Sequence, residues 1–125
     1  MTDAMITLLF GMICWVETEG NANRIAYVHG KPHAYGPAQI TAAALKDVNE
    51  YAHTDFTLRD FLGNMPLSKW AFEVYTVKRY GAKTPEEAAA IWHFGYEGSK
   101  RAHPDDDYVT RVMNLYNERK QAVGR

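Results

Sequence analysis

The chain has 125 residues, of which 46% are apolar and 23% are charged. These proportions argue against a disordered chain, and the length fits a single domain over residues 1–125. Fourteen Lys and Arg against fifteen Asp and Glu give a formal charge of −1. Because this balance offers no cationic field to a polyanion, we expect no nucleic-acid partner.

The first predicted element is a helix from about Thr2 to Thr18. Apolar side chains cover nearly every side of it: Ile6, Leu8, Leu9, Phe10, Met12, Ile13, Trp15 and Val16. A helix of this kind is typical of the centre of a domain. We expect neither a signal peptide, since Asp3 precedes the run without Lys, Arg or a cleavage site, nor membrane insertion, since the run is too short. Cys14 within it has no disulfide partner and is expected to be an inert, buried thiol.

The segment after this helix, residues 19–37, contains three Gly and two Pro. It is predicted to be a long irregular loop or a short ribbon, and ordered loops of this length are usually functional. Thr41 is placed to cap a second helix that runs to about Tyr51. Residues 53–66 are predicted to be a loop with one short turn at 58–62.

Three more helices are predicted in the second half of the chain. Ser68 is placed to cap one that Gly81 ends. The sequence Thr-Pro-Glu-Glu at 84–87 is a capping box and predicts a helix from 85 to about Phe94. Three aspartates at 105–107 suit the positive end of a last helix, and we interpret them as a solvated helix start. One apolar face of that helix is formed by Val109, Val112, Met113 and Tyr116. The fold class is therefore mainly α, with five or six helices and few strands.

Glu17 is the carboxylate in the most unusual place, because it lies where the apolar helix ends and a glycine-containing loop begins. It is either an ordinary exposed residue or an acid whose pKa is raised by desolvation and by the negative end of the helix dipole. A carboxyl that is protonated near neutral pH is what a glycosidase uses to protonate a leaving oxygen. Glu19 is the rival acid, but we expect it in the solvated loop.

Four short motifs occur in a fixed order along the chain. They are Val-Glu-Thr-Glu-Gly-Asn at 16–21, Ala-Tyr-Gly-Pro-Ala-Gln-Ile at 34–40, Ile-Trp-His-Phe-Gly at 91–95 and Tyr-Val at 108–109. They resemble the Glu-Ser-x-Gly-Asn, Gly-Leu-Met-Gln-Ile, Ala-Tyr-Asn-x-Gly and Tyr-Val motifs of soluble lytic transglycosylases and goose-type lysozymes. The resemblance implies a single lysozyme-like catalytic domain with a long active-site loop or short ribbon after the first helix. Residues 39–81 also resemble small phage-encoded members, such as endolysins.

The resemblance makes Glu17 the catalytic acid. It also implies substrate-binding roles for residues at the matching motif positions: Thr18, Tyr35, Gln39, Trp92, His93 and Tyr108. Tyr108 matches the tyrosine whose hydroxyl reaches the catalytic carboxyl. His93 is the main departure from the family pattern, because it replaces an asparagine that contacts substrate.

Four of these residues have a plainer structural interpretation. Tyr35 either orients the substrate or packs the loop, and Gln39 either binds substrate or caps the second helix. Trp92 either packs on a sugar ring or belongs to the core. Tyr108 is otherwise a packing residue in the first turn of the last helix.

The resemblance implies that the substrate is the glycan strand of peptidoglycan, cleaved at the MurNAc-GlcNAc β-1,4 bond. A lytic transglycosylase uses one glutamate and leaves 1,6-anhydro-MurNAc ends. A goose-type muramidase hydrolyses the bond, generally with aspartates near the groove, and Asp47, Asp55 and Asp60 are candidates. A third possibility is a non-catalytic glycan-binding or virion structural protein on the same fold.

We expect no cofactor and no metal. His29 and His33 are four residues apart, but Gly30 and Pro32 argue against the helix that would align them as ligands. We expect a monomer that is made in the cytoplasm without a signal peptide. It would act on the cell wall or in the periplasm after delivery by a phage particle, a holin pore or a secretion apparatus.

Overall fold

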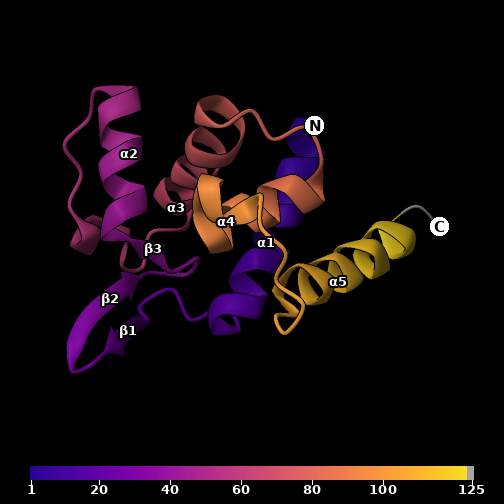
Figure 1. The fold of residues 1–125 in the computed structure, drawn as a ribbon, viewed down its shortest axis with the longest axis horizontal. Coiled ribbons are helices and arrows are strands. Elements are labelled where there is room, and N and C mark those ends of the chain that lie inside the picture. Colours follow the sequence, from indigo (N-terminus) through magenta and orange to yellow (C-terminus); the bar gives the residue numbers. More distant parts are fainter. Residues whose placement is uncertain (124–125) are drawn as a thin grey trace.

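The computed structural model describes residues 1–123, which form five α-helices and one small sheet (Figure 1). The helices are α1 (Asp3–Thr18), α2 (Ala42–Ala52), α3 (Met65–Glu73), α4 (Pro85–Ser99) and α5 (Tyr108–Val123). A 3₁₀ turn, η1 (Leu58–Phe61), precedes α3, and a π-helical stretch, η2 (Val74–Arg79), continues it. The strands are β1 (Ile25–Val28), β2 (Lys31–Tyr35) and β3 (Ile40–Thr41). The mainly α fold class is confirmed.

The segment after α1 is a short ribbon, one of the two forms predicted for it. Strands β1 and β2 pair antiparallel, and β3 pairs with β2 on its other side. The hairpin turns at His29 and Gly30, which both have positive φ. Tyr35 on β2 lies opposite Ile40 on β3, so the two ends of the 34–40 motif are held side by side.

Side-chain caps begin the helices where the sequence indicates them, with one exception. The hydroxyls of Thr41 and Thr84 accept hydrogen bonds from the N–H groups of the first turns of α2 and α4. The predicted cap at Ser68 is wrong, because α3 begins four residues earlier, where the Asn64 side chain accepts from the Leu67 N–H at 3.1 Å. Proline fits the first turn of a helix, since the first N–H groups have no intrahelical partner, and Pro66 occupies that turn.

Two predicted helix ends can be compared with the structure, one at Gly81 and one near Phe94. Gly81 follows η2 with a φ of 71° and ends this helical segment as expected. Helix α4 was predicted to end near Phe94, and there its backbone breaks, because Gly95 has φ 77° and ψ 166°. A further helical turn then runs to Ser99.

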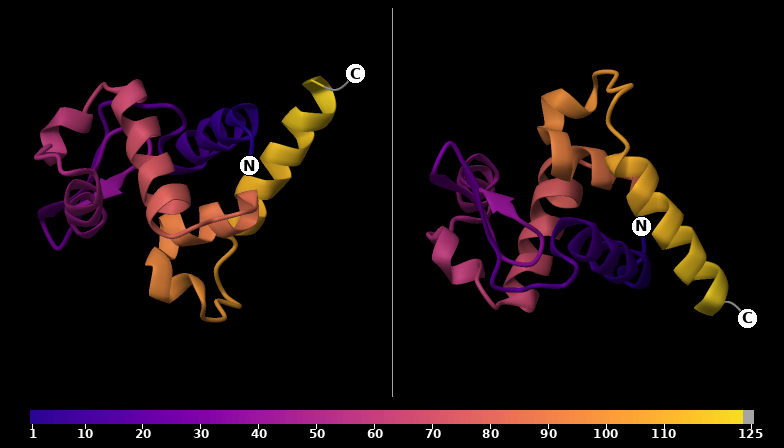
Figure 2. Two further views of the ribbon diagram at one scale, coloured as in Figure 1. Left: turned by 90° about the horizontal axis from the view of Figure 1, so that it is seen from above. Right: turned by 90° about the horizontal axis from the view of Figure 1, so that it is seen from below.

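Helix α1 lies at the centre of the described fold but is not buried on every side. The sheet and α2 lie to one side of it in Figure 1, whereas α5 packs along it and extends outward at its C-terminal end in both views of Figure 2. Leu9 and Ile13 are fully buried. Trp15 is 52% exposed, so the interpretation of this helix as one at the centre of the domain is wrong for this side chain. No helix in residues 1–123 is both long and apolar enough to cross a membrane.

Candidate active site

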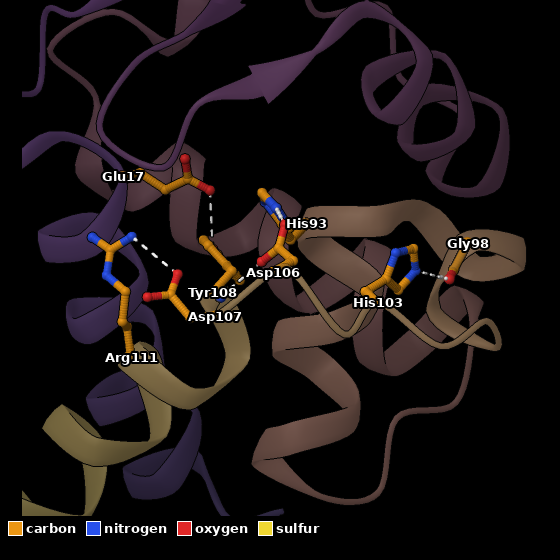
Figure 3. A network of polar contacts seen from close by, with 8 residues as sticks. All are labelled: Glu17, His93, Gly98, His103, Asp106, Asp107, Tyr108 and Arg111. Atoms are coloured by element: carbon orange, nitrogen blue, oxygen red, sulfur yellow. Dashed lines mark hydrogen bonds and ion pairs between the residues drawn. The ribbon is translucent and has the colours of Figure 1, made fainter.

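Glu17 and Tyr108 meet at the contact between α1 and α5. Glu17 lies in the last turn of α1 and is half-buried, and Tyr108 is the first residue of α5 and is 4% exposed. The Tyr108 hydroxyl donates a hydrogen bond of 2.9 Å to Oε2 of Glu17 (Figure 3). The contact that the Tyr-Val motif implied is therefore present, across 91 positions of sequence.

The surroundings of Glu17 weaken its acidity. Burial raises the pKa of its carboxyl from 4.5 to about 7, although the Tyr108 hydrogen bond and the charges of Arg111 and Arg24 oppose this rise. The charged form loses hydration on burial, which explains the direction. A group with this pKa holds a proton over part of the neutral range and can donate it.

Tyr108 keeps its own proton in this contact. Burial, followed by the negative charge of Glu17, raises the pKa of its hydroxyl well above 10. The phenol is therefore a hydrogen-bond donor to the carboxylate at any pH near neutrality.

Asp106 and His93 lie next to Tyr108 (Figure 3). Asp106 accepts the Tyr108 N–H through Oδ1 at 2.8 Å, and its Oδ2 lies 3.2 Å from Nε2 of His93. The His93 ring stacks on the Tyr108 ring with centroids 3.9 Å apart and planes 8° apart. The backbone N–H of Tyr108, followed by the hydrogen bond from His93, lowers the pKa of Asp106. Sequence reasoning missed this role of Asp106, whose only local signal is its place just before α5.

Thr18 and Gln39 are buried and bind the loop that follows β2. The Thr18 hydroxyl lies 2.9 Å from the carbonyl oxygen of Pro37. Nε2 of Gln39 donates to the carbonyls of Gly36 at 2.8 Å and Arg24 at 3.1 Å. Thr18 therefore holds the loop against the end of α1, and Gln39 holds it against the segment before β1, whereas the sequence predicted contacts with substrate for both. Neither caps a helix.

Trp92 and Tyr35 are also largely buried. Trp92 is 9% exposed, its Nε1 donates to the Ala38 carbonyl at 2.9 Å, and its ring packs edge-on against Phe72. Trp92 thus belongs to the core and supports the same loop. Tyr35, at 8% exposed, lies on β2 beside that loop.

Two of the three aspartates considered as a second carboxylate have structural partners. Asp47 accepts a hydrogen bond from the Tyr80 hydroxyl and forms an ion pair of 3.9 Å with Arg79. Asp60 accepts the Thr57 N–H at 2.7 Å and so caps η1. Asp55 is exposed.

The remaining titratable candidates lie away from this network or are buried. Glu19 is the exposed, left-handed C-cap of α1, with a φ of 53°. His29 and His33 are exposed on the hairpin, and Cys14 is buried, where desolvation raises its pKa to about 12. Among the described residues, no three His, Cys, Asp or Glu side chains are grouped so that they could hold a metal ion.

Comparison of the chain with protein-family models, with curated proteins and with solved structures found no match. The family resemblance therefore stays a prediction that depends on the motifs and on the geometry around Glu17.

Proposed function

We propose that this chain is a lysozyme-like lytic transglycosylase that cleaves the MurNAc-GlcNAc β-1,4 bond of peptidoglycan, with Glu17 as its acid. The observation that carries the proposal is the half-buried Glu17 carboxyl, with a pKa of about 7 and the Tyr108 hydroxyl 2.9 Å away. An acid that is protonated near neutral pH and fixed by a buried donor suits proton transfer to a glycosidic oxygen.

The proposed reaction uses one carboxyl twice. Glu17 first donates its proton to the glycosidic oxygen, the bond from this oxygen to C1 of MurNAc breaks, and the substrate's N-acetyl oxygen stabilises the positive charge at C1. The Glu17 carboxylate then takes the proton of the C6 hydroxyl while that oxygen bonds to C1. This closes the 1,6-anhydro ring and returns Glu17 to its acid form.

Among the side chains around Glu17, the exposed ones are proposed to contact the sugar. His93 retains 33% side-chain exposure beside the Glu17–Tyr108 pair, and an imidazole can donate to or accept from hydroxyl and acetamido groups. Tyr35 lies beside the same loop. Thr18, Gln39 and Trp92 would act indirectly, by fixing the loop that borders the acid.

Hydrolysis in the manner of a goose-type muramidase requires a base that activates water. Asp47 and Asp60 are engaged by the Tyr80 hydroxyl and the Thr57 N–H. This observation favours the reaction that needs Glu17 alone, and it leaves Asp55 as the aspartate to test. We further propose that the protein acts on the cell wall as a monomer, delivered by a phage particle or a secretion apparatus.

Digestion of purified peptidoglycan, with mass spectrometry of the products, tests the function. Anhydro-MurNAc ends are expected from the native chain and from Glu19→Gln, the matched control two residues away. Glu17→Gln is expected to release nothing. Reducing ends would replace the transglycosylase by a muramidase, binding without release would indicate a glycan-binding protein, and full activity of Glu17→Gln would refute the site.

A further inference from the structure

One carboxylate fixes two rings beside Glu17. Asp106 accepts the backbone N–H of Tyr108 through one oxygen at 2.8 Å and lies 3.2 Å from Nε2 of His93 through the other. The two rings that it holds are stacked almost parallel, with centroids 3.9 Å apart. Asp106 thus links the first residue of α5 to the imidazole on α4.

Tyr108 is held at both ends by this arrangement. Its backbone is fixed by Asp106, one face of its ring is covered by His93, and its hydroxyl donates to Glu17 at 2.9 Å. A rotation or shift of the ring would lengthen that hydrogen bond, whose strength falls steeply with distance and angle. We propose that Asp106 and His93 are positioning residues that clamp Tyr108 and so keep its hydroxyl on Glu17.

This inference rests on the proposed function, because it names residues that tune the same acid. The charged and titratable groups near Glu17 are Tyr108, Arg111, Arg24 and Cys14. Arg111 in turn pairs with Asp107 at 3.9 Å. His93 and His103 are the titratable neighbours of Asp106, and the His103 ring stacks on Phe94. Of these groups, Tyr108 alone is hydrogen-bonded to the Glu17 carboxyl among the described residues.

Carbon-13 NMR of the Glu17 carboxyl measures the pH midpoint of its protonation. This midpoint shows whether Asp106 acts on Glu17 by positioning Tyr108 or only through its negative charge. Removing a nearby negative charge lowers a carboxyl pKa, whereas losing the Tyr108 hydrogen bond raises it. We therefore expect Asp106→Ala to raise the midpoint by about half a pH unit, in the direction of Tyr108→Phe, for which we expect about one unit. Asp105→Ala, with the same charge change at an exposed neighbour, is expected to leave it unchanged.

His93→Ala keeps the hydrogen bond from the Tyr108 N–H to Asp106 and is the second test, since Asp106→Ala removes that bond and can weaken the start of α5. It is also expected to raise the Glu17 midpoint. Adding Asp106→Ala to Tyr108→Phe is expected to raise it no further, because the clamp acts through Tyr108. A midpoint that falls or stays unchanged in both Asp106→Ala and His93→Ala would overturn the inference.

The rate of peptidoglycan cleavage tests the clamp independently of the NMR titration. If the proposed function holds, Asp106→Ala lowers kcat by about tenfold or more with little change in KM, because misplacing a catalytic group slows the chemical step. His93→Ala lowers kcat as well and also raises KM, because it removes a side chain proposed to contact the sugar. The titration needs no turnover. An inactive native chain whose midpoints move as expected would therefore refute the proposed function and leave the clamp standing, whereas normal turnover with unmoved midpoints would refute the clamp alone.

Discussion

Replacing Glu17 by Gln is expected to stabilise the protein at alkaline pH and to leave its stability unchanged at acidic pH. The pKa of Glu17 is 4.5 when its carboxyl is solvated and about 7 in the folded chain. Below pH 4.5 the carboxyl is protonated in both the folded and the unfolded chain, so folding buries no charge there. As pH rises from 4.5 to 7, the unfolded chain releases this proton first, and the free energy of unfolding falls. Because one pH unit corresponds to about 1.4 kcal/mol, the loss amounts to about 3 kcal/mol above pH 7.

Urea unfolding of the native chain and of Glu17→Gln at pH 4 and pH 8 measures this difference. Glutamine is neutral at both values, so the variant should be about 3 kcal/mol more stable than the native chain at pH 8 and equal to it at pH 4. Glu19→Gln, at the exposed C-cap, serves as the matched control and is expected to show no such dependence. A Glu17→Gln difference that is the same at both pH values would refute the argument that Glu17 is buried as an acid.

Three further outcomes are expected. Cleavage of peptidoglycan should decline about tenfold per pH unit above pH 7, because Glu17 must carry a proton, and a pH–rate profile checks this. Gly36→Ala should lower the free energy of unfolding in urea by more than about 2 kcal/mol, since the added Cβ would lie 2.6 Å from a backbone oxygen. Gly20→Ala, also at positive φ but in open space, should lower it by less. Thr18→Val should lower the thermal midpoint by several degrees, because it leaves the buried Pro37 carbonyl without the hydroxyl at 2.9 Å.

The helix boundaries could be predicted where a local signal sets them. A threonine hydroxyl that accepts from the first turn needs only a few neighbouring residues, which is why Thr41 and Thr84 were correct. The error at Ser68 has the same local origin, because Asn64 offers an equivalent cap and Pro66 is tolerated in the first turn. Trp15 could not be placed, since its exposure depends on which side of α1 its neighbours leave uncovered.

The site was predicted less completely than the fold. The Glu17–Tyr108 contact followed from a motif, but the only signal that Asp106 carried was its place just before α5. Its partner His93 is 13 residues away, on the other side of the break in α4 at Gly95. Thr18 and Gln39 were assigned to substrate from the motif, whereas their hydrogen bonds are made to backbone carbonyls. A motif identifies which residues are near an acid, but burial and partners decide which of them can face a ligand.

The pKa of Glu17 results from one effect that raises it and three that lower it. Solvent screens the three lowering effects to different degrees. Burial raises the pKa, and Tyr108, Arg111 and Arg24 lower it, in that order. Both arginines are exposed, so water and salt weaken their effect on the carboxylate. The Tyr108 hydroxyl is buried and in direct contact, where a hydrogen bond to a charged group is strongest. The position of one phenol hydroxyl, rather than the number of nearby cations, therefore determines how far the pKa of Glu17 stays below the value that burial alone would give it.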